Sequence, residues 1–483
     1  MSSRIYKGTL LGAAALLLLA VSWWQAELNR LRADPRMDLV RPASLGRTAP
    51  AMLEFTTVAL GGFRGLIANA LWVRANDLQL DGKYFEMVQL ADWITKLEPT
   101  FVQVWLNQAW NMAYNISVKF SDPYDRWRWV QKGIELLRDE GLRYNPKEAL
   151  IYRELAWFFQ HKMGQNTDDA HMIYKDEWAR EIDALFGSLP PNYEELLNPK
   201  TDAERERVKT LLSKYKMDVR VMKEVDDLYG PLEWRLPEAH AIYWATVGLK
   251  ESKKKDLITL RRVIYQSMHM VVLRGRLINY STNTLPRFGP DLKKIDRTNA
   301  AYEQMIRDDK EMGFAIQGAH KVFVREMVYL LYGYHQIAEA QRWFKIAREK
   351  YPDSIPAGLS LEQFAVGRLL SGVKDMSHDR LKAFMEGLLV QHYYNLAIDE
   401  DDRAEGLETM ARQLWKFTDQ RIGDQKQRLS LVPFAEMKKA ALEQMLDPQS
   451  GVAPELIARL RTKLNLPTPP APPAPPPAGG PKA

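Results

Sequence analysis

The 483-residue chain contains no cysteine. Disulfide bonds, cysteine-ligated metal sites and a lipid anchor attached through cysteine are therefore excluded. Histidine is scarce as well, with eight residues, and no two of them have the HExxH spacing of a zinc protease. The sequence also has neither a glycine-rich phosphate-binding loop nor a GxSxG nucleophile elbow. From these absences we name no catalytic, cofactor-binding or metal-ligating residue, and we expect no cofactor.

Charge of one sign is not concentrated anywhere in the chain. The formal net charge is +6, and lysine and arginine are interleaved with aspartate and glutamate. A solvated mixed surface explains this pattern better than a nucleic-acid partner, so we expect none. Strand-like alternation of polar and apolar residues is hard to find, whereas helical periodicity recurs almost throughout. The sequence therefore predicts an all-α fold.

Long runs that are both uncharged and almost wholly apolar or small are scarce, and residues 8–24 form the clearest one. A helix through residues 5–24 spans roughly 30 Å, which is about the thickness of a hydrocarbon core. Trp23 and Trp24 end the run, where aromatic rings favour the headgroup level. We predict a signal-anchor and transmembrane helix over residues 1–24. A cleaved signal peptide is the alternative, but the bulky tryptophans directly after the small residues disfavour cleavage.

The flanking charges leave two orientations to weigh. Arg4 and Lys7 precede the uncharged run, and five arginines follow it in residues 25–50. Counting arginines alone places the body in the cytoplasm, whereas a short basic N-terminus before a secretory-type apolar run favours export. We predict a single-pass protein of the inner (cytoplasmic) membrane with a periplasmic body.

Residues 71–99 have the pattern of a helical hairpin. The apolar or small positions are Ala75 and Leu78 in the first helix, Gly82 at the turn, and Met87, Ala91 and Ile94 in the second helix, before Pro99. A second match covers residues 322–352, with Val324, Val328 and Leu331, then Ala340, Phe344, Ala347 and Pro352. His335 occupies the position of the turn glycine in this second unit. Both units resemble tetratricopeptide repeats.

The resemblance implies a solenoid of stacked helical hairpins that binds peptides or helices in its concave groove. The stretches ALGGFRGL…LW…GKY and AWNMAYNIS also resemble a broader group of bacterial membrane-anchored tetratricopeptide-like proteins, which supplies no activity. We expect a linker over residues 25–50, tetratricopeptide-like hairpins over 51–190, an irregular helical region over 191–315, tetratricopeptide-like and C-terminal helices over 316–464, and a proline-rich disordered tail over 465–483. Loops are expected at residues 188–198 and 279–296.

Residues 51–75 are apolar enough to suggest a second membrane span. However, Glu54 and Arg64 lie inside this stretch, and a charge at mid-bilayer costs at least about 2.5 kcal/mol. We therefore expect a buried helix, whose glycines allow a neighbouring helix to approach closely.

Three further groups of side chains could bind a ligand or could only stabilise the fold. His161 and His171 flank Asp168 and Asp169, where helix capping and solvation explain the pattern more simply than a metal ion. The acidic run 399–402 lacks the arrangement of a calcium-binding loop and is expected to precede a helix and favour its dipole. Eight tryptophans are expected mainly in packing between helices: Trp72, Trp93, Trp105, Trp110, Trp127, Trp129, Trp157 and Trp178.

Two functions follow from these observations. The first is a membrane-tethered scaffold or adaptor that holds a protein or peptide partner at the bacterial envelope. The second is an envelope enzyme acting on cell-wall glycan, similar to lytic transglycosylases on helical superhelices. Glu251–Ser252 matches the first element of that family's pattern, but Lys253–Lys255 follow and the second element is missing. A cleft with a buried carboxyl group of raised pKa favours the enzyme.

Overall fold

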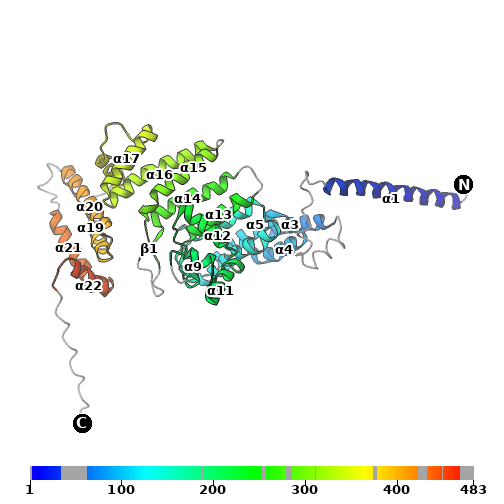
Figure 1. Cartoon of the computed structure of the whole chain (residues 1–483), viewed down its shortest axis with the longest axis horizontal. Helices are drawn as coiled ribbons and strands as arrows, with labels where there is room; N and C mark the ends of the chain where they lie inside the picture. Colours follow the sequence, from blue (N-terminus) through cyan, green and yellow to red (C-terminus); the bar gives the residue numbers. More distant parts are fainter. Residues whose placement is uncertain are drawn as a thin grey trace, which may run out of the picture. The chain divides into compact units, whose positions relative to one another are not determined.

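The computed structural model describes residues 3–33, 63–186, 189–252, 257–278, 286–309, 312–373, 378–422, 432–448 and 450–467. Helices dominate these residues, and two three-residue strands are the β-structure among them (Figure 1). The all-α prediction is confirmed. The chain divides into two compact units, one of residues 1–154 with 251–253, and one of residues 155–250 with 254–483.

Helix α1 (Ser3–Ala33) contains the long uncharged run. It continues beyond Trp24 to Ala33, so the prediction that an irregular linker begins at residue 25 is wrong. Residues 25–33 lack proline and glycine, and Glu27 lies 3.7 Å from Arg30 one turn later, an arrangement that favours helix. No helix in the described residues combines the length and the apolar character needed to cross a membrane.

The first predicted hairpin of unit 1 consists of α3 (Phe63–Leu80) and α4 (Tyr84–Leu97). Gly82 takes a φ of +71° in the turn, a conformation that glycine adopts without steric cost. The positions predicted to face the partner helix are all buried, namely Ala75, Leu78, Met87, Ala91 and Ile94. The helices, the turn and the buried positions of this hairpin are thus confirmed.

The expectation of a buried helix over residues 51–75 is only half correct. Residues 51–62 lie outside the described part of the chain, and α3 begins at Phe63. Ala68 and Ala75 are buried, but Leu66 and Val73 are more than half exposed. The apolar residues of α3 therefore lie on two faces of the helix. Helix α4 covers one of these faces.

The rest of unit 1 alternates α-helix with π-helical turns. α5 (Val102–Trp110) continues into a π-turn (Asn111–Ile116) and a 3₁₀ turn (Ser117–Lys119). α6 (Pro123–Glu135) continues into a π-turn (Leu136–Gly141) and α7 (Leu142–Tyr144). Trp105 and Trp127 are buried between these helices, as expected. α8 (Ala149–Trp157) follows and extends across the boundary between the units.

Unit 2 begins with a π-turn (Phe158–Met163) and the helices α9 (His171–Phe186), α10 (Tyr193–Leu197), α11 (Asp202–Ser213), α12 (Val219–Tyr229), α13 (Pro237–Glu251) and α14 (Ile258–Arg274). The predicted loop at residues 188–198 is wrong in part. Asn192 accepts a hydrogen bond from the backbone N–H of Glu195 and so caps the short helix α10.

A β-hairpin follows α14, where the sequence predicted an irregular helical region with a loop over residues 279–296. β1 (Arg276–Ile278) pairs antiparallel with β2 (Arg287–Gly289), with Leu277 opposite Phe288. Gly275 ends α14, and the large apolar residues beyond it suit a pleated surface.

The second predicted hairpin is also present. α15 (Ile295–Asp308), α16 (Gly313–Gly333) and α17 (Ile337–Lys350) pack in succession. Every position predicted to be buried in α16 and α17 is buried: Val324, Val328, Leu331, Ala340, Phe344 and Ala347. His335 takes a φ of +55°, so histidine adopts the left-handed conformation expected of the turn glycine.

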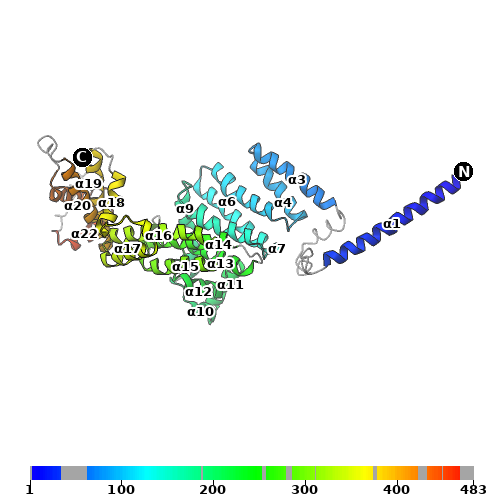
Figure 2. The same ribbon diagram turned by 90° about the horizontal axis from the view of Figure 1, so that it is seen from above.

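The C-terminal helices of unit 2 are α18 (Leu361–Val373), α19 (His378–Ala397), α20 (Asp401–Ile422), α21 (Phe434–Leu446) and α22 (Pro454–Lys463) (Figure 2). The first four match predicted helices, whereas α22 was not predicted separately. Leu389, Leu414, Met437 and Leu460 belong to one core that α19–α22 share. Residues 468–483, most of the predicted proline-rich tail, lie outside the described residues.

Candidate protein-binding site

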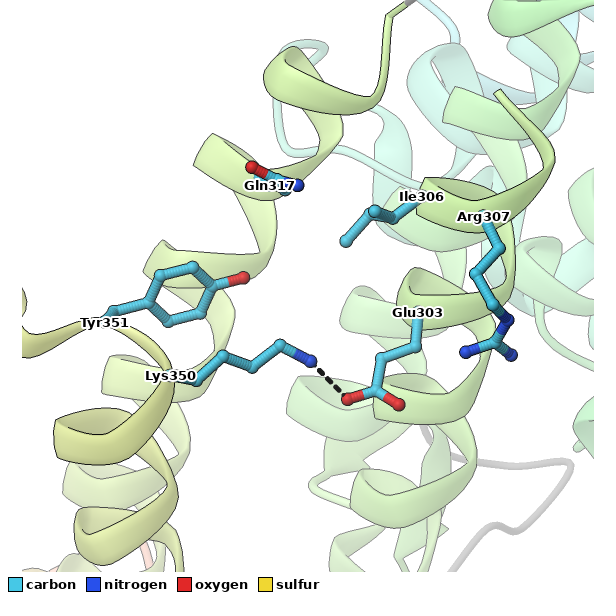
Figure 3. A pocket seen from close by; sticks show the side chains of 6 residues that line it. All are labelled: Glu303, Ile306, Arg307, Gln317, Lys350 and Tyr351. Atoms are coloured by element: carbon cyan, nitrogen blue, oxygen red, sulfur yellow. Dashed lines mark hydrogen bonds and ion pairs between the residues drawn. The ribbon is translucent and has the colours of Figure 1, made fainter. Parts of the chain in front are cut away.

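A cavity of about 310 Å³ lies among three consecutive helices of unit 2. Its lining comprises Glu303, Ile306 and Arg307 of α15, Gln317 of α16, and Lys350 and Tyr351 at the end of α17 (Figure 3). Helices α16 and α17 are held together by their buried faces, where the rings of Phe323 and Trp343 pack edge-to-face.

A continuous hydrogen-bond chain runs from Lys350 and Glu303 to Tyr351, three polar residues of this cavity, through the side chains of Asn299 and His320. Lys350 Nζ lies 2.5 Å from Glu303 Oε1, and the Asn299 side chain is hydrogen-bonded to the same carboxylate. Asn299 Oδ1 lies 2.7 Å from His320 Nε2, and the Tyr351 hydroxyl lies 2.7 Å from His320 Nδ1. Neutral His320 therefore donates from Nε2 to the amide oxygen and accepts the tyrosine proton at Nδ1.

The pKa values of these groups follow from burial and charge. Burial, with the Lys350 ammonium nearby, lowers the pKa of His320 to about 4. Burial and the negative charge of Glu303 raise the pKa of Tyr351 to about 12. Although burial opposes ionisation of Glu303, the hydrogen bonds from Lys350 and Asn299 lower its pKa. At neutral pH the carboxylate of Glu303 and the ammonium of Lys350 therefore form an ion pair, and the side chains of His320 and Tyr351 are neutral.

Helix α16 also carries an exposed aromatic side chain. Phe314 is 87% exposed and lies three residues, about one helical turn, before the cavity residue Gln317. Arg307 donates to Gln304 Oε1 at 2.8 Å, and in the described residues it has no carboxylate partner. The arrangement can hold an apolar side chain against Phe314 while Arg307 and Gln317 meet polar groups.

The residues singled out around His161 form a buried polar group. Asp168 accepts hydrogen bonds from Lys162 at 2.5 Å, from the Tyr174 hydroxyl at 3.1 Å, and from the backbone N–H of Ala170 at 2.9 Å. Asp168 is buried and not solvated, whereas Asp169 is exposed, so the expectation of solvation holds for one of the two. The bond to Ala170 N–H lies just before α9. His161 stacks on Trp157. Across the described ranges, no three His, Asp or Glu side chains are grouped to hold a metal ion.

His171 contacts a lysine. Lys175 Nζ lies 2.9 Å from His171 Nδ1, and burial lowers the pKa of Lys175 to about 7. Lys175 is almost fully buried and lines neither cavity described here.

The acidic run at 399–402 lies where the sequence analysis placed it, at the start of a helix. Asp401 and Asp402 are in the first turn of α20. Asp399 is paired with Arg459 and with Lys463, and Glu400 is paired with Arg276. These residues line a cavity of about 500 Å³, but basic side chains already neutralise them.

The expected packing of the eight tryptophans between helices is found for some of them. Trp105, Trp127 and Trp178 are buried, Trp72, Trp129 and Trp157 are half-buried, and Trp93 and Trp110 are exposed.

Two buried carboxyl groups bear on the enzyme hypothesis. Burial raises the pKa of Glu154 and of Asp226, but neither lines either cavity described above. Glu251 is exposed at the end of α13.

Neither Phe314 nor the lining of the cavity between α15 and α17 was predicted from the sequence. A signal exists in the sequence, because Phe314 lies off the apolar stripe formed by Ile316, Phe323 and Met327. The polar lining has no local signature, since it combines residues up to 48 positions apart, from Glu303 to Tyr351. No family model, curated protein or solved structure matches this chain.

Proposed function

We propose that this protein is a membrane-associated helical-repeat adaptor that binds a protein or peptide partner. Its stacked hairpins act as a tetratricopeptide-like solenoid, and its body is periplasmic. The observation that carries the proposal is that exposed Phe314 lies one helical turn from Gln317, which lines the polar cavity between α15 and α17. An exposed phenylalanine near a cavity with hydrogen-bonding groups is typical of an aromatic hot spot at a protein interface.

The size and charge of the cavity favour a side chain of a partner over a free small molecule. At about 310 Å³ it is at the lower limit of small-ligand pockets. The charges of Glu303 and Lys350 compensate each other, so this pair orients a bound group through hydrogen bonds more than it attracts it by net charge. Arg307 and Gln317 supply donors for a carbonyl or carboxylate oxygen of a partner. An extended peptide or helix that inserts one polar residue here and covers Phe314 meets both requirements.

Attachment to the membrane is the second part of the proposal. The uncharged run of residues 8–24 supports it, as do the exposed side chains of Leu16–Leu19, Trp23 and Trp24 on α1. A single attached helix raises the local concentration of the body at the lipid surface, which increases the effective affinity for partners held there. The adaptor is thus placed at the envelope with its binding site turned toward other proteins.

Photo-crosslinking in intact membranes tests the adaptor function. A benzophenone amino acid replaces Phe314, and cross-linked proteins are recovered after detergent solubilisation. We expect one reproducible partner, competed away by the unmodified protein and lost in Arg307→Ala and Gln317→Ala backgrounds. The matched control places the same probe at Leu228, an exposed leucine of α12. Equal products from both positions, or cleavage of glycan strands by the purified protein, overturn the proposal.

A further inference from the structure

The outer face of α3 carries a regular apolar stripe. Leu66, Val73 and Leu80 are 64%, 60% and 88% exposed. Their spacing of seven residues places them in one line about 21 Å long on the helix surface. The opposite face of α3, with Ala68, Ala75 and Leu78, packs against α4. Among the described residues, only the face with Ala68, Ala75 and Leu78 has a packing partner.

A stripe of this kind is unexpected at the end of a helical array. The outer face of a terminal helical repeat is usually polar, because it meets water. On α3 the three large apolar residues are flanked by Asn69 and Asn76 on one side and by Asp77 on the other. A polar border around an apolar line indicates a surface that contacts something less polar than water.

We propose that this stripe rests on a lipid surface, so that α3 lies in the bilayer interface beside the point where α1 is attached. The inference rests on the proposed membrane association. Exposed large apolar side chains are denser near this part of the chain than elsewhere. α3 and α4 expose Leu66, Val73, Leu80, Phe85 and Trp93, whereas the described residues of unit 2 expose such side chains more sparsely.

The chain between α1 and α3 limits the distance of α3 from the bilayer, so weak binding of the α3 stripe to lipid is sufficient. The 29 residues 34–62 join Ala33 to Phe63 and span at most about 100 Å. Attachment of α1 therefore limits the distance between α3 and the bilayer and raises the effective concentration of α3 at the lipid surface. Three aliphatic residues on one helical face then suffice for shallow interfacial contact.

Charge beside the stripe sets the depth and the lipid preference. Arg74 is exposed, has no carboxylate partner in the described part of the chain, and meets anionic headgroups. Asp77 is exposed between Val73 and Leu80 and keeps this face at headgroup level, because a carboxylate remains hydrated. Asp77→Asn should therefore deepen the contact.

The absence of cysteine allows the stripe to be probed one position at a time. The full-length protein carries an NBD fluorophore on a single cysteine at position 66, 73 or 80, in vesicles of phosphatidylcholine with 30% phosphatidylglycerol. The control label replaces Val118, an aliphatic residue of unit 1 that is also about half exposed. We expect doxyl-labelled lipids to quench the stripe labels at least twofold more than the control. Asp77→Asn should increase the quenching at position 73.

The outcomes separate this inference from the adaptor proposal. A protein that floats with vesicles but whose stripe labels emit as in water overturns the inference alone. A blue-shifted emission without lipid quenching also overturns it, and shows that protein, either residues 51–60 or a second copy, covers the stripe. Failure of the full-length protein to float overturns both the membrane association and the inference, while the Phe314 cross-linking test still decides the adaptor function.

Discussion

The Tyr351 hydroxyl lies 2.7 Å from Nδ1 of His320, and this hydrogen bond selects the neutral tautomer of the histidine. The second imidazole nitrogen lies 2.7 Å from Asn299 Oδ1. Protonation of Nδ1 would remove the acceptor for Tyr351 inside a buried site. The pair thus connects the acid–base state of His320 to the geometry of the candidate binding cavity.

The first prediction concerns the pH dependence that this pair creates. The pKa of His320 is about 4 in the folded protein and is close to 6.5 in an unfolded chain. Between these values the unfolded state binds more protons, so the free energy of unfolding decreases as pH falls from about 6.5 to about 4. The contribution at neutral pH is about 3 kcal/mol. It is present above pH 6.5 and lost on acidification.

Urea unfolding of the wild type and of His320→Gln at pH 7.5, 6 and 5 measures this contribution. The variant should be less stable at pH 7.5 and should lose less stability between pH 7.5 and 5. Only the difference between the two proteins is informative, because burial also lowers the pKa of His240 to about 4. Parallel stability curves for the two proteins would contradict the prediction.

The second prediction concerns the crossing of α16 and α20. A Cβ atom at Gly406 would lie 1.9 Å from the carbonyl oxygen of Gly333, which is backbone and cannot rotate away. Gly406→Ala should therefore separate the helices and lower the free energy of unfolding by about 1 to 3 kcal/mol.

Gly387→Ala on α19 is the matched control. A Cβ atom there meets nothing within 4 Å, so the substitution should stabilise the helix by about 0.5 to 1 kcal/mol. Thermal and urea unfolding of both variants check the opposite signs. Similar effects of the two substitutions would show that the close approach of α16 and α20 is absent in solution.

The third prediction concerns the buried ion pair of Lys162 and Asp168, whose charged atoms are 2.5 Å apart. Asp168→Asn leaves the lysine charge buried without a carboxylate and should cost about 3 to 5 kcal/mol. Lys162→Met combined with Asp168→Asn removes the unpaired charge and should recover much of that loss. The exposed pair Lys382–Glu386 serves as control, where Glu386→Gln should cost less than about 1 kcal/mol. If the effects of the two substitutions on the free energy of unfolding, measured with urea, simply add in the double variant, Lys162 and Asp168 are not coupled and the prediction is wrong.

The two hairpins were predictable from the sequence because their signals are local. Small residues at Ala91 and Ala340 and apolar spacing of three and four residues fix which helical face is buried. The β-hairpin at Leu277 was missed because the apolar run that ends α14 continues into β1 without a change in composition. Helical periodicity alone cannot separate a helix end from a short strand.

The cavity could not be predicted because its polar groups are brought together by packing. Glu303 and Lys350 are 47 residues apart and meet only because α15 and α17 both pack against α16. The buried pair at Asp168 was missed for a related reason. The sequence shows that Lys162 and Asp168 are near each other along the chain, but only the fold shows that both are removed from water.

The fourth prediction concerns the turn between α16 and α17. His335 has a φ of +55°, a left-handed conformation that costs a residue with a Cβ atom about 1 to 2 kcal/mol. His335→Gly should remove this cost and stabilise the protein by about 0.5 to 1 kcal/mol, since the greater entropy of glycine in the unfolded chain offsets part of the gain. The ion pair of His335 with Glu405, at 3.4 Å on an exposed surface, contributes little.

His335→Ala is the control for that last substitution, because it removes the imidazole but keeps the Cβ atom in the strained conformation. Alanine should therefore give no increase in stability, whereas glycine should. Thermal unfolding of the two variants measures the difference directly. If alanine stabilises the protein as much as glycine does, the imidazole ring and not the backbone is unfavourable in this turn, and the position loses its likeness to the turn glycine of a tetratricopeptide repeat.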